Sequence, residues 1–233
     1  MLENRVRLQK QDILRVYEAK IGLEEFAVSL LEGQLSSVDA MRLVRTYGDE
    51  KLFPILPSPR PSDKAYILFL NQQANSAKWS IHSRQHAYKL LFAVDKKTYR
   101  KPYQEFLLSH VKMAKDWGER AILYGGLIQL KDEESMKAVR EGLVDDPITE
   151  CREYILYSLQ ERREVTSAID AILVIANKED KKHDSVSVSR RPGQWSYKLN
   201  KYLEWAKSQQ RLDAPTLQKV DEAIGKLKGT DCD

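Results

Sequence analysis

Cysteine, glycine and proline are scarce in this sequence, with 2, 10 and 8 residues among 233. Two cysteines are too few for a scaffold held by disulfides, and Cys151 and Cys232 lie far apart, so we expect both to be reduced, as in a cytosolic protein. The shortage of glycine and proline excludes collagen-like and low-complexity chains. The 42% of apolar residues is enough for a hydrophobic core and argues against wholesale disorder.

Long hydrophobic runs are also missing. The longest, residues 65–70 and 171–176, are far shorter than the roughly 20 residues needed to span a bilayer. No apolar run follows the first five residues, so the sequence does not predict a secretory leader. We therefore expect a cytoplasmic protein that makes no use of a membrane.

Strand signals are scarce as well, since the chain has no Asn-Gly or Asp-Gly hairpin turn and little alternation of apolar and polar residues. Nearly every segment instead has the apolar spacing and the end signals typical of a helix. The expected helices span residues 4–21, 23–31, 63–74, 81–94, 103–115, 117–130, 132–143, 147–160, 165–177, 194–209 and 215–228. A further helix is expected after residue 31, with Ser36 or Ser37 as its N-cap and its end at Gly48. Residues 53–61 contain four prolines, which predict an extended, stiff connector because proline lacks the N–H that a helix needs.

These signals predict five segments along the chain. They are an N-terminal helical cap (1–53), a proline-rich connector (54–62), a helical-repeat region (63–177), a polar loop (178–193) and C-terminal capping helices with a tail (194–233).

An arginine-led pattern recurs in the second helix of each expected hairpin. Arg84, Arg120 and Arg152 are each followed three, six and seven positions later by apolar or small residues, which share one face of a helix. The arginines are 36 and 32 residues apart. A helical hairpin that recurs at this interval is typical of an α-solenoid, because one pair of helices cannot bury its apolar face alone.

Residues 143–155, which read Leu-Val-Asp-Asp-Pro-Ile-Thr-Glu-Cys-Arg-Glu-Tyr-Ile, resemble the Asp- and Pro-containing turn and the Val-Arg-x-x-Ala helix of HEAT-type repeats. Cys151 stands in place of the valine and Ile155 in place of the alanine. The resemblance covers about residues 63–177 and implies an all-α, right-handed α-solenoid of helical hairpins with capping helices at both ends. Tetratricopeptide repeats are the rival, because their period is about 34 residues and residues 117–124 partly match their pattern.

Charge is distributed unevenly along the repeat region. Residues 61–115 carry 10 basic and 3 acidic side chains, whereas residues 116–180 carry 8 basic and 15 acidic ones. The two blocks give the molecule a large dipole if they are separated in space. Alternatively, they attract each other across a packing surface.

Candidate catalytic and metal-binding residues do not combine into a site. His82 and His86 are four residues apart but have no acidic third ligand nearby. Gly125 and Gly126 lack the strand and the Gly-Lys-Ser/Thr ending of a phosphate loop and indicate tight helix packing. Cys151 falls on the packed side of its helix, and adjacent carboxylates such as residues 145–146 point about 100° apart on a helix. We expect no enzymatic activity, no metal and no cofactor.

The sequence therefore favours a non-enzymatic protein-binding module, either an adaptor or an inhibitor or immunity-type protein that neutralises a protein partner. The HEAT resemblance implies that the second helices of successive pairs line a concave binding face. The residues expected to contact the partner are Trp79, His82, Gln85, Tyr88, Lys89, Trp117, Arg120, Tyr124, Glu150, Glu153 and Tyr157. The polar and charged members of this set are expected at positions that are not needed for packing. They are His82, Gln85, Lys89, Arg120, Glu150 and Glu153.

Nucleic-acid binding is the alternative, because residues 96–103 and 190–202 combine basic with aromatic side chains, which suit phosphates and unstacked bases. Residues 117–123 are also similar to a repeat helix of the HEAT-like alkylpurine DNA glycosylases. The tryptophan-rich segment that carries the catalytic aspartate of that family has no counterpart here, so glycosylase activity is not expected. The apolar spacing that begins in residues 190–202 also predicts an ordinary helix face that packs in the core. That face consists of Trp195, Leu199, Tyr202 and Ala206.

Overall fold

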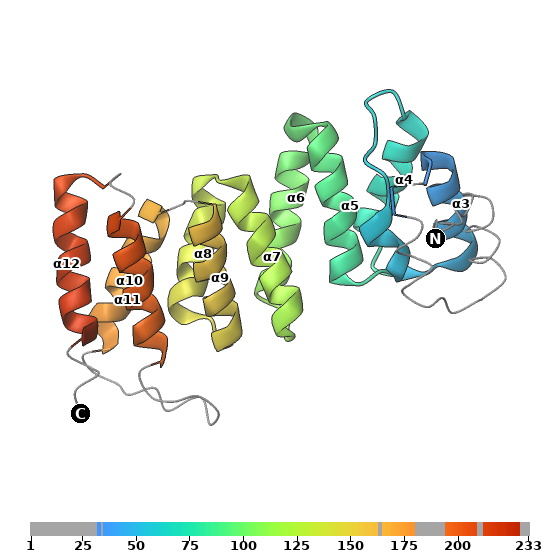
Figure 1. Cartoon of the computed structure of the whole chain (residues 1–233). Helices are drawn as coiled ribbons and strands as arrows, with labels where there is room; N and C mark the ends of the chain where they lie inside the picture. Colours follow the sequence, from blue (N-terminus) through green and yellow to red (C-terminus); the bar gives the residue numbers. More distant parts are fainter. Residues whose placement is uncertain (1–31, 34, 163–164, 180–193, 209–211, 229–233) are drawn as a thin grey trace, which may run out of the picture. The chain divides into compact units, whose positions relative to one another are not determined.

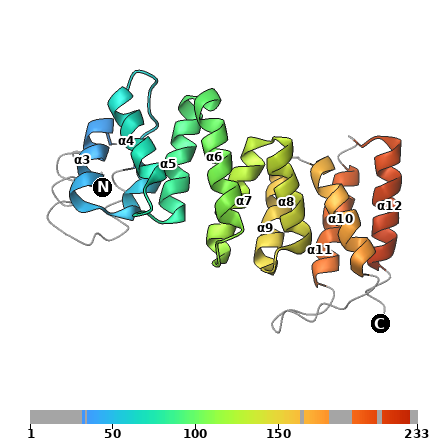
Figure 2. The same ribbon diagram turned by 180° about the vertical axis from the view of Figure 1, so that it is seen from behind.

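The computed structural model describes residues 32–33, 35–162, 165–179, 194–208 and 212–228 of the chain. All regular secondary structure in these ranges is helical, which confirms the predicted all-α class (Figures 1 and 2). The chain divides into two compact units, Met1–Phe106 and Leu107–Asp233. Across the described ranges, no helix is both long enough and apolar enough to cross a membrane. The helices predicted over 4–21 and 23–31, most of the loop 178–193 and the tail lie outside the described residues.

The first unit is built from helices packed around an aromatic core. Its elements are α3 (Ser37–Tyr47), η1 (Glu50–Ile55), α4 (Lys64–Asn75), α5 (Ile81–Val94) and most of α6 (Lys96–Val111). Helices α4 and α5 pack directly against each other, as the predicted hairpin requires. Phe53, Tyr66 and Phe69 are buried, and the Phe53 ring lies 5.1 Å from the Trp79 ring between centroids. Aromatic side chains therefore supply much of the apolar area that holds this unit together.

The ends of α3 follow from local sequence signals. The Ser36 hydroxyl accepts a hydrogen bond from the Asp39 N–H at 3.2 Å, which satisfies one of the free donors of the first turn. At the other end, Gly48 adopts a φ of 61° and donates its N–H to the Val44 carbonyl at 3.0 Å. Glycine suits this left-handed conformation because it has no Cβ to clash with the backbone. The predicted serine cap and glycine stop are both confirmed.

The predicted extended connector is wrong at its start, because the 3-10 helix η1 continues through Pro54 to Ile55. The fixed φ of proline lies within the range of a 3-10 helix, so a short one tolerates it. The rest of the connector is not helical, as expected, and it is attached to α4 where the Tyr66 hydroxyl donates to the Pro57 carbonyl at 3.0 Å.

Helix α6 begins at Lys96, seven residues before the predicted start, and includes Pro102. Its first turn is stabilised by Asp95, whose carboxylate accepts from the Thr98 N–H at 3.0 Å and from the Thr98 hydroxyl at 2.6 Å. These hydrogen bonds lower the pKa of Asp95. Further along, the buried Tyr103 ring contacts Tyr88 and Phe92 of α5 with centroids 5.9 Å apart in both pairs. Packing and capping together outweigh the cost of the proline.

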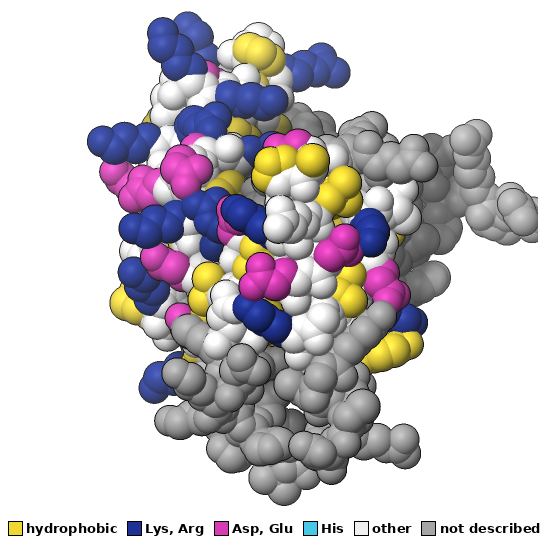
Figure 3. Space-filling view, turned by 90° about the vertical axis from the view of Figure 1, so that its left-hand side faces the viewer, with side chains coloured by type: hydrophobic (Ala, Val, Ile, Leu, Met, Phe, Trp, Pro, Cys, Tyr) yellow, Lys and Arg dark blue, Asp and Glu magenta, His cyan; other side chains and the backbone are white. Residues whose placement is uncertain are grey.

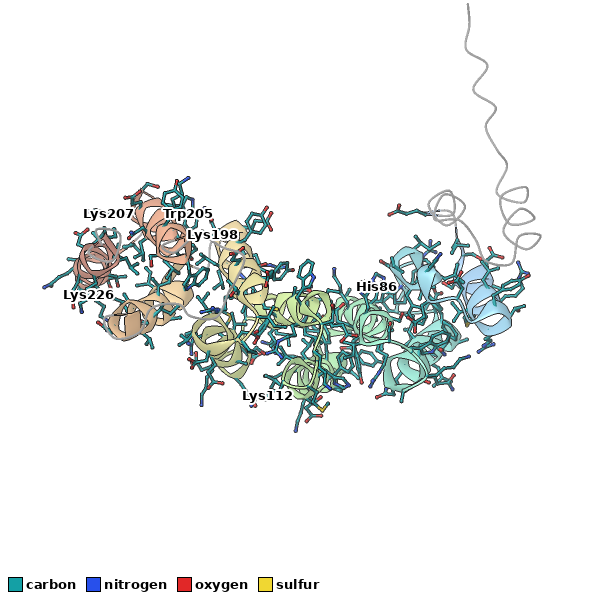
Figure 4. All side chains as sticks on the ribbon, turned by 90° about the horizontal axis from the view of Figure 1, so that it is seen from below. His86, Lys112, Lys198, Trp205, Lys207 and Lys226 are labelled. Atoms are coloured by element: carbon teal, nitrogen blue, oxygen red, sulfur yellow. The ribbon has the colours of Figure 1, made fainter. Side chains whose placement is uncertain are left out.

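In the described part of the second unit, six helices follow the end of α6. They are α7 (Trp117–Leu130), α8 (Glu133–Asp145), α9 (Thr149–Glu161), α10 (Val165–Glu179), α11 (Gln194–Ser208) and α12 (Ala214–Lys228). Helix α8 packs on α7, α9 and α10, and α10 also packs on α9, α11 and α12. Viewed from below, α9 and α11 lie on one side of α10 (Figure 4). This arrangement places the α9 and α11 surfaces next to each other.

The inward face of α11 is the one that the sequence predicts. It is buried within the second unit. The buried residues include Trp195, Leu199, Tyr202 and Ala206. Their helical spacing is therefore explained by packing, and this part of the second basic and aromatic stretch is not a free surface.

A candidate protein-binding groove in the second unit

Three of the residues predicted to contact a partner are buried in the first unit. The Trp79 indole N–H donates to Gln73 Oε1 at 2.7 Å, and the Tyr88 hydroxyl donates to an amide oxygen of α4 at 2.8 Å. The Gln85 side-chain amide donates to the Tyr103 hydroxyl at 3.0 Å. The expectation that Gln85 takes no part in packing is therefore wrong, because this polar side chain faces α6 and is satisfied there.

The two histidines of α5 differ in exposure. His82 is exposed and His86 is partly buried. Burial, together with the nearby positive charge of Lys89 and with His82, lowers the pKa of His86 to about 4, so this ring is neutral at physiological pH. His86 is labelled in Figure 4. No cluster of three or more metal-ligating side chains occurs in the part of the chain that the structure describes. Lys89 is exposed, as predicted for a surface contact.

In the second unit, Arg120 and Tyr124 belong to a buried polar network centred on Asp146. Asp146 Oδ2 accepts from Arg120 Nε at 2.9 Å, from Arg120 Nη2 at 2.6 Å and from the Tyr124 hydroxyl at 2.8 Å. The other carboxylate oxygen accepts from the Ile148 N–H at 2.9 Å, which shapes the turn between α8 and α9. Burial and the neighbouring Asp146 raise the pKa of Tyr124. The expectation that Arg120 is free of packing is wrong, because its charge is paired inside the unit.

Trp117 is the first residue of α7, and it is 55% exposed. The helix start is capped by Asp116, whose carboxylate accepts from the Gly118 and Glu119 N–H groups at 2.8 and 3.1 Å. The Trp117 carbonyl accepts a hydrogen bond from the Cys151 thiol at 3.5 Å. These contacts fix the backbone that carries an exposed indole.

Cys151 is buried, as its predicted position on the packed side of α9 requires. Burial is the main cause that raises its thiol pKa to about 11, and the nearby Asp146 carboxylate adds to the effect. Because the thiolate is the reactive form, this cysteine is a poor nucleophile at neutral pH.

A groove of about 940 Å³ lies between α9 and α11. The α9 wall, extended by Trp117 of α7, brings together four residues predicted from the sequence. They are Trp117, Glu150, Glu153 and Tyr157. Tyr154, Leu156 and Gln160 also line this wall, and residues 150, 153, 154 and 157 follow the i, i+3, i+4, i+7 spacing of one helix face. The rings and carboxylates of this wall therefore face the same space.

The α11 wall was not predicted to contact a protein partner, although three of its residues, Lys198, Lys201 and Tyr202, belong to the basic and aromatic stretch that suggested nucleic-acid binding. Its lining includes Lys198, Lys201, Tyr202, Glu204 and Trp205. A sequence signal exists, because residues 198, 201, 202 and 205 also follow helical spacing, but that pattern does not reveal which other helix they face. Trp205 and Lys198 are labelled on this helix in Figure 4.

The two walls are joined by an ion pair. Lys198 Nζ of α11 lies 2.7 Å from Glu153 Oε2 of α9, and both side chains are partly exposed. On the same helix, Lys201 Nζ lies over the Tyr197 ring, 4.9 Å from its centroid. On the other wall, the Tyr157 hydroxyl donates to the Glu161 carboxylate at 3.0 Å. The groove thus has an aromatic wall with the carboxylates of Glu150 and Glu153, facing an aromatic wall on which two lysines outnumber one glutamate, Glu204.

The surface around α12 differs in character from the groove. Seen from the α12 side, acidic and basic side chains are interspersed (Figure 3). Lys207 pairs with Asp221 at 2.7 Å, and Lys226 pairs with Glu222 at 2.6 Å. Exposed pairs of this kind contribute little to stability or recognition. The groove therefore stands out as the better candidate for binding.

Comparisons with known proteins give no relative from which a function can be transferred. No family model matches the chain, and neither a curated protein nor a solved structure matches it significantly. The functional argument therefore depends on the geometry of the groove.

Proposed function

We propose that this protein is a non-enzymatic protein-binding module, an adaptor or an inhibitor, and that the groove between α9 and α11 receives a segment of its partner. The observation that carries the proposal is the exposure of Trp117 and Tyr157, at 55% and 59%, on a groove of about 940 Å³. Trp, Tyr and Arg dominate the energetics of protein interfaces. Burial of one large ring contributes roughly 1.5–3 kcal/mol, so two rings offer a substantial anchor.

We further propose that the helices form a HEAT-like α-solenoid, with tetratricopeptide-like repeats as the rival. The packing of α7 on α8 and of α8 on α9 and α10 supports this interpretation. So does the position of Asp146 in the turn of the HEAT-like segment, where it receives Arg120 from the preceding hairpin. Solenoids act mostly through extended binding surfaces, in keeping with a binding role.

The groove is tested by comparing capture of partners from native lysate. We expect the wild-type protein to retain a partner that the double variant Trp117→Ala/Tyr157→Ala loses by at least about tenfold, since removing two hot-spot rings costs well over 1.4 kcal/mol. The matched control is Tyr47→Ala, which removes an exposed ring from α3 of the first unit. Both side chains of the double variant are exposed, so its melting temperature should stay close to that of the wild type. Identical capture by all three proteins would contradict the proposal.

Nucleic-acid binding is the second candidate, favoured by a cluster at the start of α6. All four basic side chains of this turn, Lys96, Lys97, Arg100 and Lys101, are exposed. If they contact phosphates, affinity for generic DNA or RNA should fall by about two orders of magnitude between 50 and 200 mM salt. Fluorescence anisotropy with a labelled oligonucleotide measures this directly. Absence of binding at about 50 mM salt would dispose of this candidate, because non-specific affinity is strongest at low salt.

A further inference from the structure

We propose that the α9 wall of the groove binds an arginine side chain from a basic segment of the partner protein, with the guanidinium between the exposed rings and the carboxylates. This inference rests on the proposed function and specifies the chemistry of the partner. Three features of the second unit carry it: the aromatic rings, the carboxylates beside them and the basic character of the opposite wall.

The rings provide flat surfaces for a cation. Trp117 and Tyr157 are among the most exposed large apolar side chains of the described residues. Tyr154 lies on α9, three residues before Tyr157. Its hydroxyl packs against Gly125 of α7, where an added Cβ would lie 2.8 Å from the hydroxyl oxygen. An Arg guanidinium or Lys ammonium placed over a Trp or Tyr ring gains about 0.5–2 kcal/mol.

The carboxylates make this wall attractive to cations. Glu150 and Glu153 are one turn apart on α9 and line the same groove as the rings. Glu153 is paired with Lys198 and is held in place at the groove. Residues 116–180, which include this wall, carry 15 acidic and 8 basic side chains, so a cationic segment is also attracted over a longer range. Aromatic faces combined with carboxylates favour arginine over lysine, because the planar guanidinium stacks and donates two parallel hydrogen bonds.

The opposite wall limits where the cation can lie. Lys198, Lys201 and Glu204 line it, so its positive charges are in the majority. Lys198 is paired with Glu153, and Lys201 already lies over the Tyr197 ring. A second positive charge is repelled there, whereas a backbone carbonyl or an acidic side chain is attracted. The partner segment is therefore expected to direct its arginine toward α9 and its acceptors toward α11.

The chemistry of the occupant is tested with a displayed library of random twelve-residue peptides. Peptides are selected on the wild-type protein and screened for loss of binding to Trp117→Ala/Tyr157→Ala. We expect the groove-dependent peptides to be enriched in arginine. Their affinity should fall about tenfold when Glu150 is replaced (Glu150→Gln) and similarly when the peptide arginine is replaced by citrulline, its neutral analogue. Glu141→Gln, which neutralises an exposed glutamate of α8 outside the groove, should change affinity less than twofold.

The outcomes separate this inference from the proposed function. Groove-dependent peptides that are proline-rich, acidic or purely apolar would overturn the arginine assignment and leave the groove as a protein-binding site. The arginine assignment would also be overturned if arginine-containing peptides bound the Glu150→Gln variant as tightly as the wild type. The same holds if the Glu141→Gln variant lost as much affinity for them as the Glu150→Gln variant. If selection yields no groove-dependent peptide, both the inference and the proposed use of the groove fail.

Discussion

Replacing Asp146 with asparagine should lower the free energy of unfolding by about 3–5 kcal/mol, because it leaves a buried guanidinium without its counter-ion. The Asp146 side chain is fully buried and that of Arg120 is only 12% exposed. One carboxylate oxygen accepts both the bidentate arginine and the Tyr124 hydroxyl, and the other accepts the Ile148 N–H. Asparagine keeps the size of the side chain but loses the charge and introduces donors that the arginine cannot satisfy.

This effect is measured by urea unfolding followed by far-UV circular dichroism. The matched control is Asp145→Asn, which neutralises the adjacent, exposed aspartate and should change the stability by less than about 0.5 kcal/mol. The double replacement Arg120→Met/Asp146→Leu should recover part of the loss, since apolar residues of similar volume avoid the unpaired charge. A change below about 1 kcal/mol for Asp146→Asn would show that the network is not a major source of stability.

Replacing Gly142 with alanine should destabilise the protein by about 1–3 kcal/mol through overpacking. An added Cβ would lie 2.5 Å from Cε1 and Cζ of Tyr124, too close for any real contact. The Tyr124 ring is buried and its hydroxyl is bound to Asp146, so the ring has little freedom to move away. The clash outweighs the roughly 1 kcal/mol that alanine gains over glycine within a helix.

Gly225 of α12 provides a control of opposite sign. It is exposed, and, apart from its chain neighbours and the backbone of its own helix, no described atom lies within 4 Å of an added Cβ. Gly225→Ala should therefore stabilise the protein by about 0.5–1 kcal/mol through helix propensity alone. Thermal unfolding of the two variants side by side gives the comparison. If Gly142→Ala and Gly225→Ala raised the melting temperature equally, the packing of α7 against α8 would not hold the Tyr124 ring in place.

The Asp146 and Gly142 predictions concern the packing of α7 against α8, and α7 also supplies Trp117 to the groove. Arg120 lies one turn after Trp117 on α7, and it also donates to the Ala114 carbonyl at 2.9 Å just before that helix begins. The Asp146 network therefore fixes the segment that presents the exposed indole. Loss of the network is expected to weaken partner binding as well as folding, whereas Glu150→Gln should weaken binding without loss of stability.

Most helix boundaries follow from the sequence, because periodicity and capping act over a few residues. The predicted helices 81–94 and 117–130 agree to the residue with α5 and α7. The serine and glycine that delimit α3 act as predicted. The start of α6 and the continuation of η1 through Pro54 were missed. In both places a proline predicts that the chain is not helical. In α6, aromatic packing against α5 outweighs the cost of the proline, and in η1 the 3-10 geometry accommodates it.

The sequence by itself determined that this protein is helical and which faces of α9 and α11 are apolar, and it named Trp117, Glu150, Glu153 and Tyr157 among the expected contacts of a partner. Only the tertiary structure decided that Gln85 and Arg120 are satisfied inside the units and that α11 supplies the second wall of the groove. The physical reason is the range of the interactions. Helix periodicity is set by neighbours in the chain, whereas a buried polar group or a groove wall depends on residues far away in sequence, such as Lys198 opposite Glu153.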